Sequence, residues 1–128
     1  MKPFHIYLYG PSQGPLTCSF EVACRQLQSL PGMFLELDGS FVWRPGIGAQ
    51  SAGGHPATPQ LDGMLYDAAD QIQYVDLKGQ CQQTHFRQIC QCLALPPDST
   101  ADILVLPSRD LQTLQGFEQS VFGCPKIS

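Results

Sequence analysis

The sequence predicts an α+β fold in a single domain over residues 1–128. Runs with alternating or continuous apolar residues, typical of strands, are followed by runs with apolar residues three and four positions apart, typical of helices. Gly and Pro clusters separate these runs. A chain of 128 residues that is 43% hydrophobic and 14% charged can bury a core without disulfides or a metal.

The chain is predicted to begin with a strand and a helix. The strand covers residues 4–9, and its alternation places Tyr7 and Tyr9 on the face opposite its aliphatic residues. The helix is expected over residues 17–29, with Thr17 as its N-cap.

Residues 33–44 are predicted to form a hairpin that is apolar on both faces. Asp38-Gly39 is typical of a two-residue type I′ turn. Closing the hairpin there places Phe34, Phe41 and Trp43 on one face. Because a half-buried sheet carries polar residues on its outer face, this aromatic face predicts a cover: another layer of the chain, a second subunit or a ligand.

The second half of the chain is predicted to form a loop, a hairpin, a helix, a strand and a helix. Residues 45–60 lack periodicity and predict a mobile loop. The hairpin comprises residues 63–66 and 72–78, with a register that is ambiguous by one residue. A helix over residues 81–95 and a buried strand over 103–106 follow. The last helix is expected to begin at Ser108 and to bury Leu111, Leu114, Phe117 and Val121.

Without the second hairpin, this order is β-α-β-β-α-β, the ferredoxin-like pattern. We therefore expect a ferredoxin-like sandwich with an inserted second hairpin and a C-terminal helix. In it, the first strand lies beside the third and both main helices cover one face. The other face gathers the expected binding residues, with Arg44 placed to hold an anionic ligand: Tyr7, Tyr9, Phe34, Phe41, Trp43 and Arg44. The second hairpin or the last helix folding over this face is the alternative.

Two short motifs are similar to those of a known family. Gly10-x-x-Gln13-Gly14 after the first strand, together with Asp38-Gly39, resembles the acylphosphatases, small ferredoxin-like enzymes that hydrolyse acyl phosphates. The resemblance places Cys18 where the family has a phosphate-binding arginine, and Glu36 near its water-positioning asparagine. A thiol and a carboxylate cannot bind phosphate as a guanidinium and an amide do. The resemblance therefore supports the fold and argues against that activity.

Charge and composition argue against nucleic-acid and membrane partners. The net charge is −4, and the seven basic residues are scattered rather than gathered in a stripe that neutralises phosphates. No run reaches the roughly 18 apolar residues that span a bilayer, and the N-terminal apolar run is too short for a secretory signal. We expect a cytoplasmic protein whose six cysteines are thiols.

The cysteines and histidines suggest two weaker kinds of site. Cys81, His85 and Cys92 lie along one flank of the second predicted helix, where Cys81 and His85 can chelate one ion. No Cys-x-x-Cys pair supports this zinc site, so no metal or cofactor is predicted. Cys18, near a helix N-terminus that lowers a thiol pKa, is the best-placed nucleophile. No catalytic set is specified.

These patterns favour a non-catalytic domain that acts through binding. We expect it to form a homodimer through the aromatic sheet face, in an isologous contact. The alternative is a small-ligand-binding protein or enzyme with a pocket between that face and the 45–60 loop, using Arg44 and His55 as polar contacts. A metal-bound regulatory domain is a third hypothesis.

Overall fold

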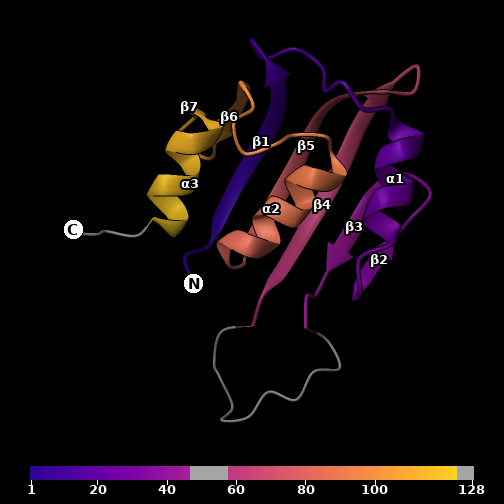
Figure 1. Cartoon of the computed structure of the whole chain (residues 1–128), viewed down its shortest axis with the longest axis horizontal. Coiled ribbons are helices and arrows are strands. Elements are labelled where there is room, and N and C mark those ends of the chain that lie inside the picture. Colours follow the sequence, from indigo (N-terminus) through magenta and orange to yellow (C-terminus); the bar gives the residue numbers. More distant parts are fainter. Residues whose placement is uncertain (47–57, 124–128) are drawn as a thin grey trace.

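The structure is a computed structural model that describes residues 1–46 and 58–123. A seven-stranded antiparallel sheet carries three helices, which confirms the α+β class (Figure 1). The strand order is β2-β3-β4-β5-β1-β6-β7. In chain order the elements are β1 (Phe4–Pro11), α1 (Phe20–Gln28), β2 (Met33–Leu35), β3 (Ser40–Trp43), β4 (Gln60–Ala68), β5 (Gln71–Gln80), α2 (Gln83–Cys92), β6 (Ala101–Val105), β7 (Asp110–Thr113) and α3 (Leu114–Phe122).

The core lies between the sheet and its helices. Along β1, the alternate residues that start at Phe4 are buried, whereas Tyr7 and Tyr9 are half-buried, as predicted. Phe4 packs edge-to-face against Phe86 of α2 and Phe117 of α3, at centroid distances of 6.2 and 5.3 Å. In Figure 1, α1 and α2 lie in front of the sheet and α3 lies beside β6 and β7. The sheet therefore has one helix-covered face and one open face.

The register of the first hairpin differs from the prediction by one residue. Glu36 donates its N–H to the carbonyl of Ser40 at 2.9 Å, which leaves a three-residue loop that ends at Gly39. Gly39 has a φ of +95°, the left-handed conformation that closes such a loop. The slip turns Phe41 and Trp43 onto the helix-covered face, where they are 3% and 2% exposed. Their predicted place on the open aromatic face is wrong.

The strand order also differs from the prediction. The first strand was expected beside the third, but β1 lies between β5 and β6. The ferredoxin-like arrangement is not confirmed, because this order differs from that fold. The hairpin of β4 and β5, with strands of 9 and 10 residues, occupies the centre, and the 3-residue β2 lies at an edge. A long neighbouring strand can form more backbone hydrogen bonds with β1. A short strand at the edge of the sheet exposes little unpaired backbone.

Several element boundaries differ as well. The N-cap of α1 is Ser19, whose hydroxyl accepts the N–H of Val22 at 3.1 Å, rather than Thr17. Where a helix was expected from Ser108, the chain turns and continues as β7, which pairs with β6. Leu111 is accordingly 50% exposed on β7 rather than buried in a helix.

Two other expectations concern the loop at residues 45–60 and the absence of a membrane-spanning segment. Most of the loop predicted at residues 45–60 falls on residues 47–57, which lie outside the described residues. In the part of the chain that the structure describes, no helix combines the length and the apolar composition needed to cross a membrane.

Candidate functional site

The open face of the sheet is the first candidate. It is formed by the strand residues that alternate with the core residues, and it includes all four tyrosines of the chain. We define it by His5, Tyr7, Tyr9, Phe34, Val42, Asp62, Met64, Tyr66, Tyr74, Asp76, Lys78, Leu104 and Leu111. Each of the seven strands contributes at least one aromatic or aliphatic side chain to this surface.

Tyr74 is the centre of a tyrosine cluster on this face. Its ring stacks on Tyr66 at a centroid distance of 4.7 Å and an interplanar angle of 19°. Tyr7 and Tyr9, on the neighbouring β1, lie 5.0 and 5.5 Å from it. Burial raises the pKa of Tyr74, and the neighbouring Tyr66 phenol adds to the rise. The phenol at the centre of the cluster therefore stays protonated at physiological pH.

A polar strip lies beside the tyrosine cluster on the same face. His5 Nε2 and Asp76 Oδ1 are 2.8 Å apart, which joins β1 to β5. At the end of β3, Arg44 Nε donates to the side chain of Gln60 at 3.1 Å, and Gln60 donates to Asp62 at 3.0 Å. Arg44 is thus engaged with this strip, not with the indole of Trp43, which points into the core.

The structure divides the predicted binding residues into two groups. Tyr7, Tyr9 and Phe34 lie on the open face, and Arg44 lies at its margin. Phe41 and Trp43 lie in the core. Trp43 donates its indole N–H to the carbonyl of Pro31 at 2.8 Å, beneath the helices.

Sequence reasoning missed Tyr66 and Tyr74. The β4–β5 ladder shifts register between Tyr66 and Asp67, so that one extra residue, Gln73, separates Tyr74 from Ile72. This bulge brings Ile72 and Val75 to the same buried face although they are three residues apart. The irregular spacing of these aliphatic residues is the signal that could have resolved the register.

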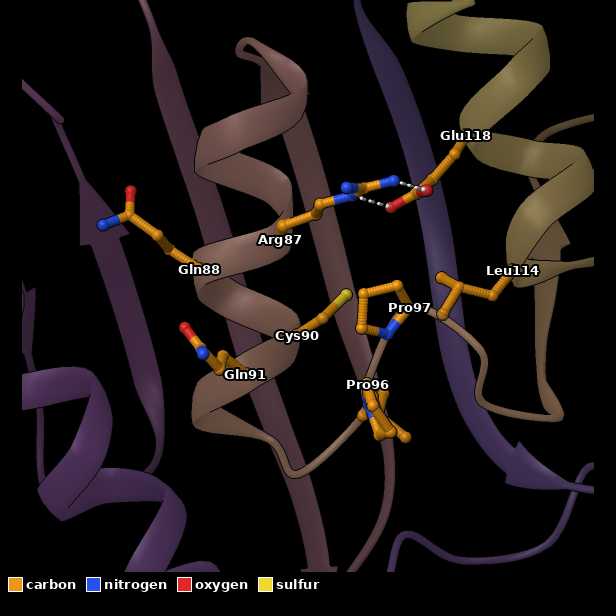
Figure 2. Close-up of a pocket in the computed structure, with 9 residues that line it drawn as sticks. Arg87, Gln88, Cys90, Gln91, Pro96, Pro97, Leu114 and Glu118 are labelled. Atoms are coloured by element: carbon orange, nitrogen blue, oxygen red, sulfur yellow. Dashed lines mark hydrogen bonds and ion pairs between the residues drawn. The ribbon is translucent and has the colours of Figure 1, made fainter.

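The pocket between α2 and α3 is a second candidate. Its volume is about 270 Å³, and it lies on the helix-covered side of the molecule (Figure 2). Cys90 of α2 and Leu114 of α3 face each other across it, with Pro96 and Pro97 closing one end. Leu95 also lines it. Arg87 and Glu118 close the other end.

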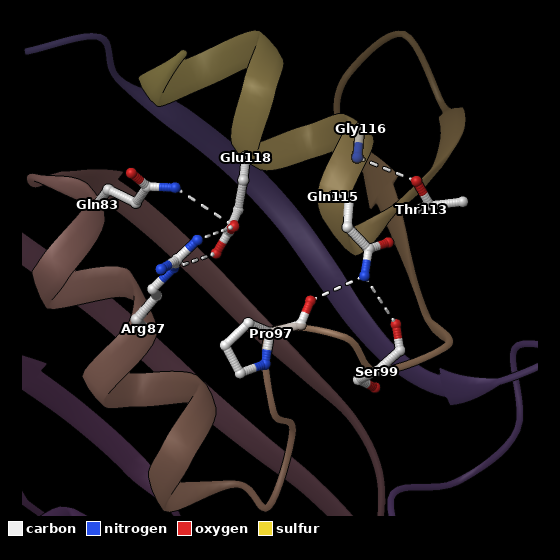
Figure 3. Close-up of polar contacts among 8 residues, drawn as sticks. All are labelled: Gln83, Arg87, Pro97, Ser99, Thr113, Gln115, Gly116 and Glu118. Atoms are coloured by element: carbon white, nitrogen blue, oxygen red, sulfur yellow. Dashed lines mark hydrogen bonds and ion pairs between the residues drawn. The ribbon is translucent and has the colours of Figure 1, made fainter. Parts of the chain in front are cut away.

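A buried carboxylate connects these two helices. Glu118 is 6% exposed. It accepts hydrogen bonds from Arg87 Nε at 3.3 Å and Nη2 at 3.2 Å, and from the amide of Gln83 at 3.3 Å (Figure 3). Hydrogen bonding to Glu118 and the negative charge of that carboxylate raise the pKa of Arg87. Gln115 extends the connection by donating to the carbonyl of Pro97 at 2.8 Å.

The five cysteines among residues 1–46 and 58–123 are poor nucleophiles. Burial raises the pKa of Cys18, which contradicts the predicted lowering by a helix N-terminus. Burial also raises the pKa of Cys81 to about 12, and that of Cys90 still further. A thiol that stays protonated at neutral pH neither attacks a substrate nor binds a metal well.

The predicted metal ligands have structural contacts instead. His85 accepts the N–H of Gln82 at 3.2 Å, and its ring lies 5.7 Å from that of Trp43. Within residues 1–46 and 58–123, no group of three or more His, Cys, Asp or Glu side chains is placed to hold a metal ion. The pocket predicted between the aromatic face and the 45–60 loop involves His55, which lies outside the described residues.

Comparison with known proteins identifies no family model, curated protein or solved structure that matches this chain. The open face and the α2–α3 pocket are therefore the features of this chain that bear on its function.

Proposed function

We propose that this protein is a binding module that self-associates as a homodimer through the open face of its sheet. The observation that supports this most is the gathering of all four tyrosines on the face opposite the helices. Tyr66, Phe34 and Leu111 on this face are 40%, 54% and 50% exposed. Apolar surface of this extent on a sheet face is typical of an interaction site.

The dimensions of the face fit a stable dimer. Seven strands at spacings of about 4.8 Å give a width of roughly 29 Å. The central strands β4 and β5, of 9 and 10 residues, are roughly 30 Å long. A face of this size can contribute the roughly 800 Å² per partner that specific interfaces bury. Two such sheets pack about 10 Å apart, which suits interdigitated tyrosine rings.

The charges of the face also permit a second copy. The chain carries a net charge of −4, so two copies repel at long range. On the open face, however, Asp76 lies 2.8 Å from His5, and Asp62 is opposite Lys78 in the β4–β5 ladder. Asp102, opposite Tyr9, accepts the N–H of Gln13 at 3.1 Å. A two-fold axis through the tyrosine cluster then brings the neutral region of one copy onto that of the other.

The experiment compares the mass of the full chain in solution with that of charge variants. We expect the wild type to sediment as a dimer at concentrations above about 10 µM. Tyr66→Glu places a charge in the interface and should yield a folded monomer. Leu37→Glu adds the same charge at a hairpin position that is 99% exposed and off the open face, so it should remain dimeric.

Trp43 fluorescence reports whether each variant is folded, because Trp43 is the only tryptophan and is 2% exposed. A wild type that stays monomeric up to about 500 µM, or a Tyr66→Glu variant that still dimerises, contradicts the proposal.

A further inference from the structure

The pocket between α2 and α3 has a polar end, formed by Arg87 and Glu118, and an otherwise apolar lining. It lies on the side of the sheet away from the proposed dimer face. We propose that it binds a small carboxylic acid with an apolar or aromatic body, whose carboxylate is held by Arg87. This inference goes beyond the self-association proposed above and does not depend on it.

The apolar part of the pocket sets the size of the ligand. Leu114, Cys90 and Leu95 are 1%, 3% and 5% exposed, and they form its walls together with Pro96 and Pro97. An apolar cavity of about 150 Å³ accepts benzene, so a pocket of about 270 Å³ accepts a ligand of roughly ten non-hydrogen atoms. The protonated thiol of Cys90 behaves here as a small apolar group.

The sign of the ligand charge follows from the exposure of the two charged groups. The side chain of Glu118 is 7% exposed and already accepts three hydrogen bonds, so it is not available to a cationic ligand. The side chain of Arg87 is 50% exposed, and it is the charged group that a ligand can reach.

Glu118 also orients the guanidinium group of Arg87 for this role. Of the five N–H donors of an arginine, Nε and Nη2 each use one on Glu118. Nη1 and the second hydrogen of Nη2 donate to no other group among residues 1–46 and 58–123. These two nitrogens can form the paired hydrogen bonds that a carboxylate accepts. Glu118 fixes the orientation of the guanidinium plane before a ligand binds.

The test is a titration of the isotopically labelled full chain with phenylacetate and with phenylacetamide, followed by NMR. The two probes share the same body, and only phenylacetate is charged. We expect phenylacetate to bind with a dissociation constant of about 1 mM, and at least about tenfold more tightly than the amide. The largest changes in chemical shift should occur at Cys90, Leu114 and the side-chain amide of Gln91.

The double variant Arg87→Gln, Glu118→Gln removes both charges, so the net charge of the chain is unchanged. It should bind the two probes with equal affinity. The matched control is Glu21→Gln, Arg25→Gln, which removes an exposed ion pair of 3.4 Å on α1 and should keep the preference for the acid.

Three results overturn the proposal: no binding of phenylacetate to the wild type at about 10 mM, shift changes confined to another surface, or a preference for the acid that survives in the Arg87→Gln, Glu118→Gln variant. If that variant does not fold, equal affinity of the wild type for acid and amide is sufficient to reject it.

Discussion

Removing Arg87 should destabilise the fold more than removing Glu118, although the two side chains form one ion pair. Arg87→Met leaves the Glu118 carboxylate buried, with the amide of Gln83 at 3.3 Å as its remaining partner. Leaving a buried charge without its partner costs about 3–5 kcal/mol, and we take the lower end of this range because Gln83 remains. Glu118→Gln instead leaves an arginine that is half exposed and can turn to water, so we expect about 1 kcal/mol.

The assay is urea unfolding at neutral pH, followed by the fluorescence of Trp43. The double variant Arg87→Met, Glu118→Leu should be close to the wild type in its free energy of unfolding, because it leaves no buried charge without a partner. An Arg87→Met variant within about 0.5 kcal/mol of the wild type, or one more stable than Glu118→Gln, refutes the reasoning that burial of Glu118 sets the asymmetry.

Three further predictions concern the core and the capping of α2. Trp43→Ala should reduce the free energy of unfolding by about 3–5 kcal/mol in urea melts followed by circular dichroism, because the side chain is 2% exposed; a change below about 1 kcal/mol would mean that the indole is not in the core. Gly63→Ala should cost about 1–3 kcal/mol in the same assay, because its Cβ would clash with the buried ring of Phe41. Burial lowers the pKa of His85, so the unfolded chain binds more protons than the native one below about pH 6.5, and stability falls as the pH drops through that value. His85→Gln keeps an acceptor for the N–H of Gln82 and should reduce this pH dependence, whereas an unchanged pH profile would assign it to other groups.

The alternation and spacing of apolar residues were sufficient to predict most helices and strands and the two faces of β1. Phe4 lies under the helices, while Tyr7 and Tyr9 point to the open face, as their period-two pattern indicates. That part of the candidate site is therefore contained in local sequence. The position of the first hairpin at the edge of the sheet is not contained in local sequence. It depends on which of the two hairpins pairs with β1.

The register of the first hairpin shows why the rest of the face was mispredicted. Asp38-Gly39 is compatible with a two-residue loop and with a three-residue loop, since both place glycine at positive φ. The two loops differ by one residue in register, and this difference decides whether Trp43 lies in the core or on the surface. The residues of the turn do not favour one loop over the other. Burial of the large side chains of Phe41 and Trp43 in the core favours the three-residue loop.

The Arg87–Glu118 pair was not predicted because 31 residues separate its members along the chain. One sequence signal did exist. Glu118 is four residues after Leu114, so it lies on the helical face that the pattern predicts to be buried. A charged residue at such a position indicates a buried partner, but its identity depends on how α3 packs against α2.

The most direct test of the proposed dimer is to observe contacts between two copies of the open face. We would mix isotopically labelled and unlabelled chains and record isotope-filtered NOEs from the ring protons of Tyr7, Tyr66 and Tyr74. A dimer that forms through the open face should give intermolecular NOEs between these tyrosines and Met64 or Leu104 of the other copy. Intermolecular NOEs confined to helical residues such as Val22, or none at a concentration where the protein sediments as a dimer, would contradict it.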